Sequence, residues 1–580
     1  MQPAYVPRVA FLEESPFNRK SEPQERMAKA IRDASGESGL VVAPCGSGKS
    51  AVLIEAALQA GAKVLIFCYE AQGVHQIERD LHDHTELGPS AICKCTGKTK
   101  QAPRGHFCFM VTTYGMFAGP TGKRNAESNT VRDMVENTEW DLICCDEAHH
   151  MCADTYKPMI QKLKAKRKLG FTATPYRSDC YSNDQDEEEH IEKAFGWFGK
   201  VLVRIPWREV DAAGLIAKIG RARVYVDMTP EFRKAYHLSV LSQKQYLAAL
   251  NPAKLDALVA LCAMHKAFNH GGIVFVTHLL VANVVKRCLT RCLGEGWEVL
   301  SGGSAHGEEA VHTALENANI VERFNNGELR GLVCTNVAAG AMDIPDCSFA
   351  IDLDTDGGRA NMAQRMGRVA RTPRINPEPG ESDESLLARR LEKQKEAWYY
   401  DLVTRDTEEE NTAARRQEFF ASEGYCEEID VPLDALLARL RGEGVPPAYE
   451  ELPDQLKLLK EVLQYNSLKT VCAEANAAVA KAKAPHSDAV KRLKKRSNDD
   501  KLHPFFKKRA ADAYKEATKA QKQVTAQAKE VRRHTIENAP LDKETHEIFR
   551  ALELPPEVLA DAGLMEVAFA PSDDERGAGK

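Results

Sequence analysis

The chain has 580 residues, of which 43% are hydrophobic and 28% are charged, and its formal net charge is −6. This length allows about three or four domains with buried cores, and the slightly acidic balance excludes a surface that attracts polyanions everywhere. No apolar run reaches the ~18–20 residues that cross a membrane, and no signal-peptide pattern precedes Pro7. We therefore expect a soluble intracellular protein, nuclear or cytoplasmic, with the nucleus favoured.

The first chemically informative segment is the run Ala-Pro-Cys-Gly-Ser-Gly-Lys-Ser at residues 43–50. It follows the apolar run Gly39–Val42 and precedes a helical pattern at 51–60. Glycines let backbone N–H groups close around phosphate oxygens, a lysine reaches the outer phosphates, and a serine hydroxyl can bind magnesium. The order strand, loop, helix predicts a nucleoside triphosphate site, although Ala43 stands where the usual pattern has its first glycine.

Residues 24 to about 205 alternate short apolar runs with helical stretches. Such alternation predicts a parallel sheet that is covered by helices on both faces. The strands are expected at 63–69, 107–112, 142–146 and 169–172.

An acidic motif, Asp146-Glu147-Ala148-His149, follows the expected strand 142–146. A strand-end aspartate can hold magnesium, and the adjacent glutamate can orient or deprotonate an attacking water. An ordinary acidic loop is the alternative, but the position about a hundred residues after a phosphate loop favours the catalytic interpretation.

Residues 256–430 repeat the alternation of strands and helices, with strands expected at 273–276, 332–335 and 350–353. In this half, the run 364–371 carries Arg365, Arg368 and Arg371 at i, i+3 and i+6, which fall along one side of a helix. A solvated basic face and a site for an acidic partner are possible. The sharper interpretation is an arginine finger, which stabilises charge on a transferred phosphoryl group.

Residues 431 to about 545 are rich in Ala, Lys, Leu and Glu and are expected to be helical. From Lys481 to Arg533, 17 Lys and Arg stand against 6 Asp and Glu, and Phe505-Phe506 precedes a further basic run. Basic residues near aromatic ones suit phosphate contact with base stacking. A nuclear-import signal and a solvated basic helix face remain alternatives.

The 16 cysteines lie mostly in apolar patterns and are expected to be reduced core thiols. Cys93-x-Cys95 and His106-x-Cys108 suggest zinc only weakly, because their spacing is not that of a known closed site.

Taken together, the motifs resemble those of a superfamily 2 helicase. Ser21-Glu22-Pro23-Gln24 resembles the adenine-reading glutamine motif, and the run 112–115 resembles the strand end that touches the nucleic-acid backbone. The run 170–175 resembles the motif that couples hydrolysis to lobe movement, and 334–345 resembles the lobe-interface motif.

Several segments resemble the XPB-type helicases of transcription and repair in particular. They are the Pro-Cys-Gly-x-Gly-Lys-Ser form of the phosphate loop, Glu139-Trp140-Asp141-Leu142, the run 228–232, the run 356–359 and the segments 398–403 and 416–419. The likeness covers about residues 20 to 430. The sequence departs from the family pattern in three places. We expect the family's N-terminal damage-recognition domain to be missing. Arg177-Ser178-Asp179 stands where the family has Arg-Glu-Asp, and an unrelated helical region stands in place of the family's C-terminal tail.

The resemblance implies an α/β fold with two tandem RecA-like parallel-sheet lobes and a helical C-terminal extension. The expected segments are an N-terminal extension at 1–19, an ATP-binding lobe at 20–205, a connector with a thumb-like helical element at 206–255, a second lobe at 256–430 and a partly basic helical region at 431–580.

It also implies that ATP and Mg²⁺ bind between the lobes. The residues expected to bind the nucleotide are Gln24, Pro44, Cys45, Gly46, Ser47, Gly48, Lys49, Ser50 and, at the ribose, Asp343. Ser50 and Asp146 would hold magnesium. The expected catalytic residues are Glu147 as general base together with Asp146, Lys49, Arg368, Arg371 and Gln364. The residues expected at the nucleic acid or in coupling are Thr113, Thr172, Thr174 and Thr335.

The favoured function is that of an ATP-dependent DNA helicase or translocase, 3′ to 5′ by resemblance, acting on duplex or single-stranded DNA, within a transcription or repair complex. One alternative is an ATPase that remodels RNA or releases transcripts. Another is a non-catalytic interaction protein on a helicase fold.

Overall fold

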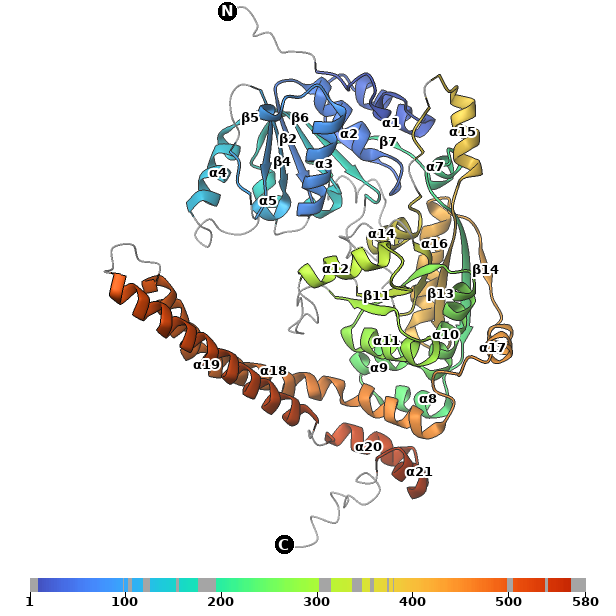
Figure 1. The fold of residues 1–580 in the computed structure, drawn as a ribbon. Coiled ribbons are helices and arrows are strands. Elements are labelled where there is room, and N and C mark those ends of the chain that lie inside the picture. The colour runs from blue at the N-terminus through green and yellow to red at the C-terminus, as the bar shows by residue number, and fades with distance from the viewer. Residues whose placement is uncertain are drawn as a thin grey trace, which may run out of the picture.

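The computed structural model describes residues 9–97, 99–102, 107–117, 126–152, 156–175, 195–301, 314–335, 347–354, 359–372, 375–378, 380–497, 504–537 and 541–564. It contains two parallel sheets flanked by helices and a long helical arm (Figure 1).

The first lobe is built on a seven-stranded parallel sheet. Its strands are β1 (Gly39–Val42), β2 (Lys63–Cys68), β3 (Ile92–Cys95), β4 (Cys108–Thr113), β5 (Glu139–Asp146), β6 (Lys164–Thr172) and β7 (Val201–Arg204), in the order β3-β4-β2-β5-β6-β1-β7. Its helices include α1 (Glu22–Asp33), α2 (Lys49–Ala60), α3 (Ala71–His84), α4 (Ala126–Asn137) and α5 (Lys157–Ile160).

The second lobe repeats this plan. Its strands are β8 (Lys218–Val226), β9 (Gly271–Val276), β10 (Trp297–Leu300), β11 (Gly331–Thr335), β12 (Cys347–Asp352), β13 (Glu396–Thr404) and β14 (Glu428–Asp430), in the order β10-β11-β9-β12-β13-β8-β14. Its helices include α7 (Trp207–Ala212), α8 (Pro230–Leu238), α9 (Leu241–Ala249), α10 (Pro252–Ala267), α11 (Leu279–Leu293), α12 (Ala314–Asn325), α14 (Arg359–Val369), α15 (Asp383–Glu392), α16 (Glu408–Ser422) and α17 (Leu433–Gly442).

The C-terminal region is helical, as expected. It consists of α18 (Leu452–Ser497), α19 (Pro504–Glu537), α20 (Lys543–Ala551) and α21 (Pro556–Asp561). The α/β fold with two tandem RecA-like lobes and a helical extension is therefore confirmed.

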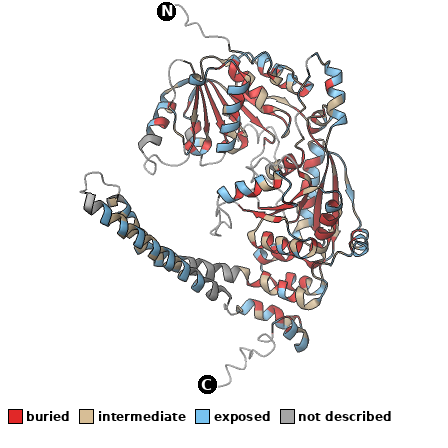
Figure 2. Cartoon of the chain, in the orientation of Figure 1, coloured by how far each residue is buried: buried red, intermediate tan, exposed pale blue. Residues whose placement is uncertain are grey.

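The strands are apolar because helices cover both faces of each sheet. All residues of β1 and β11 are buried, and Figure 2 shows burial concentrated in the strands of both lobes. Apolar burial of this kind contributes roughly 25 cal/mol per Å². The carboxyl ends of the parallel strands form one edge in each sheet, and functional groups of open α/β sheets gather outside that edge.

The segment expected as a connector, 206–255, contributes to the second sheet. Strand β8 pairs in parallel with both β13 and β14, and the thumb-like element consists of two helices, α8 and α9. The domain boundaries stay a prediction, and the sheet topology favours a second lobe that begins at β8.

One stretch, Leu241–Ala267, has the length and the apolar composition of a membrane-spanning helix, and 83% of its most apolar window is buried. Lys, Gln, Asn, Asp and His residues interrupt this stretch, so it contains no uninterrupted apolar run of ~18–20 residues. Its burial is typical of core helices, and Asn251 and Pro252 separate the stretch into α9 and α10.

The described cysteines are free, and most are buried. Cys93 Sγ and Cys108 Sγ lie 3.7 Å apart, while His106 lies outside the described residues. Within the described part of the chain, no group of three or more possible ligands could hold a metal ion.

Candidate active site

The phosphate loop joins the end of β1 to the start of α2. Gly46 and Gly48 have φ values of 84° and 82°, a left-handed conformation that glycine adopts without steric cost. Ala43 has no positive φ and is fully buried, so its position does not require glycine. The departure of Ala43 from the usual pattern therefore leaves the loop geometry intact.

Lys49 is the first residue of α2 and is 8% exposed. Its Nζ donates to the carbonyl oxygens of Ala43 at 2.9 Å and Pro44 at 3.0 Å. An ammonium has three donors, so these bonds leave capacity for an anion next to the glycines. Ser47 Oγ donates to Pro44 O at 2.8 Å, which makes Ser47 a brace of the loop, while Ser50 follows half-buried in the first turn of α2.

The acidic motif lies at the carboxyl end of β5. Burial and the neighbouring charge of Glu147 raise the pKa of Asp146 to about 7, while Lys49 opposes the shift. Glu147 has a φ of 48°, a strained conformation for this residue type that is frequent at functional sites. Its Oε2 is buried, accepts no hydrogen bond among the described residues and lies 3.4 Å from His149 Nδ1. A buried acceptor without a hydrogen bond suits a water or metal-bound group.

His149 connects this motif to the second lobe. Its Nδ1 lies 3.1 Å from Thr172 Oγ1 and its Nε2 lies 3.0 Å from Gln364 Nε2. Thr172 Oγ1 in turn donates to Thr174 O at 2.7 Å. Burial, with Lys49 nearby, lowers the pKa of His149 to about 4. The imidazole is therefore neutral near pH 7 and can accept at one nitrogen while donating at the other.

The helical spacing predicts that the three arginines of the 364–371 run share one face, but only Arg365 and Arg368 lie on α14, and their surroundings differ. Arg365 is buried in the second lobe and pairs with Asp352 at 3.3 Å, and Arg371 follows the end of α14. Arg368 is 7% exposed. Burial lowers the pKa of Arg368 and is the largest influence on it. Cys45, Glu147 and other neighbours that can carry negative charge oppose this shift. Arg368 thus interacts electrostatically with both Cys45 of the phosphate loop and Glu147 of the acidic motif, whereas Arg365 is engaged by Asp352.

The lobes touch where Gly367 of α14 meets Cys45 of the phosphate loop. A Cβ added to Gly367 would lie 2.6 Å from Cys45 Cβ, a distance that real Cβ atoms do not tolerate. Burial raises the pKa of the Cys45 thiol, and Lys49, Arg368 and Arg371 lower it. Both arginines therefore interact electrostatically with the phosphate loop.

Gln24 lies against the phosphate loop, but its side-chain oxygen is hydrogen-bonded to Ser21 at the start of α1. Its Oε1 accepts from Ser21 N at 2.9 Å and from Ser21 Oγ at 3.0 Å, which closes a capping box at α1. Its Nε2 lies 2.0 Å from where a Gly48 Cβ would stand. Gln24 is therefore beside the nucleotide loop, with its amide nitrogen facing it.

The coupling threonines lie at strand ends, as predicted. Thr113 and Thr335 are the last residues of β4 and β11, and Thr172 and Thr174 are buried next to His149. Asp343 and Arg177-Ser178-Asp179 lie outside the described residues.

Sequence reasoning missed Glu70. It follows β2 at the same sheet edge, and burial raises its pKa while Arg368 lowers it. Its position directly after the expected strand 63–69 was the available signal. Tyr114 was also missed as a support, since its hydroxyl donates to Asp146 O at 2.8 Å.

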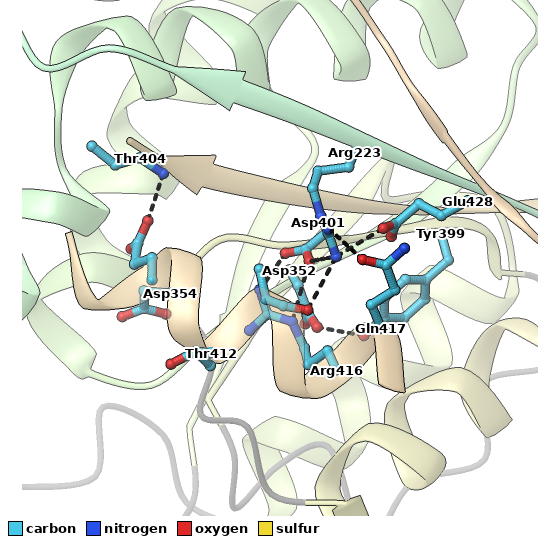
Figure 3. Close-up of polar contacts among 12 residues, drawn as sticks. Arg223, Asp352, Asp354, Tyr399, Asp401, Thr404, Thr412, Arg416, Gln417 and Glu428 are labelled. Carbon is cyan, nitrogen blue, oxygen red and sulfur yellow. Dashed lines mark hydrogen bonds and ion pairs between the residues drawn. The ribbon is translucent and has the colours of Figure 1, made fainter. Parts of the chain in front are cut away.

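A buried ionic network links β12 and β13 to α16 (Figure 3), and Arg365 of α14 joins it through Asp352. Asp352 pairs with Arg365 and accepts from Tyr399 Oη at 2.5 Å. Arg416 of α16 pairs with Asp401 of β13, and burial that would lower the Arg416 pKa is outweighed by Asp401 and Asp352. The network extends through Arg223 to Glu428 at 2.8 Å, so the arginine helix rests on a fixed base.

The residues present fit a magnesium nucleoside triphosphate. The glycine cradle and Lys49 suit phosphates, and Ser50 and Asp146 supply the oxygen ligands that magnesium prefers. Glu147 Oε2, which accepts no hydrogen bond among the described residues, lies beside them, and Arg368 approaches from the second lobe.

Comparison with known proteins agrees with this geometry. The C-terminal helicase family described as ERCC3/RAD25/XPB matches residues 210–491, and the family described as type III restriction enzyme, res subunit, matches residues 19–177.

Three similar relatives carry the name general transcription and DNA repair factor IIH helicase/translocase subunit XPB. The chain is 27% identical to the Encephalitozoon cuniculi protein over 70% of this chain and 55% of that protein. It is 28% identical to the Dictyostelium discoideum protein over 77% and 50%, respectively, and 27% identical to the Saccharomyces cerevisiae protein, XPB/SSL2, over 78% and 48%.

The chain therefore spans about half the length of the curated relatives it matches. Two family matches cover the two lobes in order, with the phosphate loop and acidic motif in one and the arginine helix in the other. The chain is similar to the XPB-type helicases over both lobes.

Proposed function

We propose that the protein is an ATP-dependent DNA helicase or translocase of the XPB type. The observation that carries the proposal is the contact of α14 with the first lobe, where Gly367 meets Cys45 of the phosphate loop and Gln364 meets His149 of the acidic motif. It supports a site to which each lobe contributes, so that hydrolysis depends on how the lobes are placed.

In this proposal, the first lobe binds the nucleotide. The backbone around Gly46, Ser47 and Gly48 cradles the phosphates, Lys49 contacts the outer ones, and Pro44 and Cys45 shape the loop. Ser50 and Asp146 hold Mg²⁺, which when bound supplies positive charge beside the transferred phosphoryl group. Glu147 takes the proton of the attacking water.

The second lobe stabilises charge that develops on the phosphoryl group. Arg368 is the main candidate because it lies near Glu147 and the loop, and Arg371 is a supporting cation. Gln364 positions His149 rather than the nucleotide. Gln24 contacts adenine and Asp343 the ribose, as the resemblance implies.

Movement along nucleic acid follows from opening and closing the lobes. Thr113 and Thr335 contact the backbone at the strand ends, whereas Thr172 and Thr174 relay the state of His149. Backbone contacts carry no sequence information, so binding is independent of sequence. We propose DNA as the substrate and a role in transcription or repair from the names of the relatives, and a 3′ to 5′ sense and a nuclear location from the resemblance.

The test is the rate of ATP hydrolysis by the full chain without nucleic acid, with duplex DNA, with single-stranded DNA and with RNA. The proposal expects DNA to stimulate hydrolysis and Glu147→Gln to abolish it. Stimulation by RNA alone would favour an RNA-remodelling ATPase instead. Equal rates for wild type and Glu147→Gln would contradict the catalytic assignment.

A further inference from the structure

The α18–α19 hairpin forms an arm with its own surface chemistry. Its base packs against the second lobe, since α18 contacts α9 and Gln243 Nε2 of α9 donates to Leu463 O at 3.1 Å, and α20 and α21 of the C-terminal region also contact α18. Beyond the base, the two helices project together away from the lobes (Figure 1). Among the described side chains from 477 to 531, none is buried, so the outer arm presents its residues to its surroundings (Figure 2).

One face of α19 concentrates positive charge. Lys508, Lys515, Lys519 and Lys522 are all exposed, and their spacings of seven, four and three residues place them on one side of the helix. The alanines at 510, 513, 517 and 520 are half-buried on the opposite side, where small side chains let α18 approach. The hairpin therefore holds this row of lysines outward.

The same face is hollowed. A groove of about 280 Å³ is lined by Tyr514, Lys515, Thr518, Lys519 and Lys522. Thr518 Oγ1 donates to Tyr514 O at 2.8 Å, which leaves its oxygen as an acceptor. The two carboxylates nearest in sequence, Asp512 and Glu516, are exposed on the adjoining flank and do not line the groove.

We propose that this face of α19 binds the phosphate backbone of the nucleic acid on which the lobes act, as a second contact outside the ATP site. The inference rests on the proposed function and deepens it. The row from Lys508 to Lys522 covers 15 residues, and its ends lie about 21 Å apart at the rise of an α-helix. A duplex carries one phosphate per ~1.7 Å of axis, so several phosphates lie within reach of such a row.

Charge complementarity favours a polyanion over an apolar protein partner. The groove is lined by three lysines, one threonine and one tyrosine, with no aliphatic side chain to anchor a hydrophobic helix. The tyrosine ring adds a surface on which a base or sugar can stack. Phosphates would also relieve the mutual repulsion of the lysines, so binding should stabilise an arm that has no buried core of its own.

The test is the salt dependence of binding to a 30-base-pair duplex by the full chain. Replacing the four lysines by glutamine (K508Q/K515Q/K519Q/K522Q) should reduce the slope of log Kobs against log[salt] by about 0.9 for each lost phosphate contact, up to about 3.6. The matched control K508R/K515R/K519R/K522R keeps the charges and should keep the slope. ATP hydrolysis without nucleic acid should be unchanged in both.

A gain-of-charge variant keeps the proposal testable if the glutamine variant loses its helical structure by circular dichroism. D512K/E516K adds cations beside the row and should steepen the slope by up to about 2. An unchanged slope in the folded glutamine variant, or in D512K/E516K, would overturn the proposal. Poly-glutamate serves as a probe for an acidic protein partner. If the glutamine variant loses binding to poly-glutamate but binds DNA normally, the proposal is likewise overturned, in favour of such a partner.

The two levels of failure are distinct. If wild type binds duplex DNA and is stimulated by it, but the slope of log Kobs against log[salt] is the same in wild type and the glutamine variant, only the arm proposal fails. If wild type neither binds nucleic acid nor responds to it, the proposed function fails. A parallel titration with single-stranded RNA distinguishes the two sources of phosphate backbone.

Discussion

Gln364 Nε2, on α14 of the second lobe, lies 3.0 Å from His149 Nε2 in the acidic motif of the first lobe. Because the pKa of His149 is lowered to about 4 by burial and Lys49, the neutral ring accepts from the Gln364 amide and donates through Nδ1 to Thr172. One polar chain therefore runs from the second lobe, through the acidic motif, to the coupling segment of the first. The predictions below test this chain, the lobe contact and the base on which α14 rests.

Breaking the contact should weaken coupling more than nucleotide binding. Gln364→Ala removes one hydrogen bond, worth about 1 kcal/mol net, so we expect DNA-stimulated hydrolysis to fall about fivefold with little change in the Kd for ATP. The measurement is kcat with and without duplex DNA. Gln59→Ala, an exposed glutamine on α2, is the matched control. A fall in ATP affinity with normal stimulation would contradict the coupling role.

The approach of α14 to the phosphate loop should require a glycine. Gly367→Ala places a Cβ 2.6 Å from Cys45 Cβ, so the lobes cannot close fully and we expect hydrolysis to drop at least tenfold. Cys45→Gly removes the opposing Cβ, and the double variant should recover activity. Steady-state hydrolysis of the two single variants and the double variant checks this. Additive losses, without recovery, would mean that the contact is not limiting.

The buried network beneath α14 should be costly to break. Arg416→Ala leaves the buried Asp401 with Arg223, 3.3 Å away, as its remaining cationic partner, so we expect a loss near the lower end of the ~3–5 kcal/mol that breaking a buried ion pair costs in the free energy of unfolding. Denaturant unfolding measures this. The exposed pair Arg233–Asp406, with side chains 42% and 71% exposed, gives the control, since Arg233→Ala should cost at most about 1 kcal/mol. Equal losses would contradict the role of burial.

Asp354 should make stability depend on pH. Burial raises its pKa to about 7, whereas an unfolded aspartate titrates near 4. Between about pH 4 and pH 7 the folded state holds a proton that the unfolded state has released, so the free energy of unfolding falls as pH rises through this window. The fall is complete above about pH 7.

The variant Asp354→Asn tests this sign. Asparagine cannot ionise but can still accept from Thr277 N, which lies 2.7 Å from Asp354 Oδ1. We expect Asp354→Asn to raise Tm relative to wild type by more at pH 8 than at pH 4. Asp227→Asn, with a side chain that is 72% exposed, should show no such difference. An equal change in Tm at both pH values would remove the titration from the explanation.

Much of the first-lobe site could be predicted from local sequence. The phosphate loop and the acidic motif each follow an apolar strand run, and both signals lie within a few residues of chain, so their positions hold in the structure. The contacts between lobes could not be predicted in this way. The pairs Gly367–Cys45 and Gln364–His149 join residues more than 200 positions apart, and no local pattern encodes such a meeting.

The helical spacing of the three arginines breaks off before Arg371, because α14 ends at Val369. Arg365 and Arg368 both lie on α14, but Arg365 pairs with Asp352, a contact that helical spacing cannot reveal. Glu70 escaped notice because a single glutamate after a strand has no distinctive pattern. Its meaning appears only when Arg368 is brought near it.

The central claim is that the second lobe supplies Arg368 to a nucleotide held by the first. The most direct measurement is single-turnover ATP hydrolysis by Arg368→Ala, alongside its Kd for ATP, in the presence of duplex DNA. The account predicts nearly unchanged ATP binding and a rate lowered by ~10³–10⁵, as for other arginine fingers. Hydrolysis at the wild-type rate by a folded Arg368→Ala protein would contradict it.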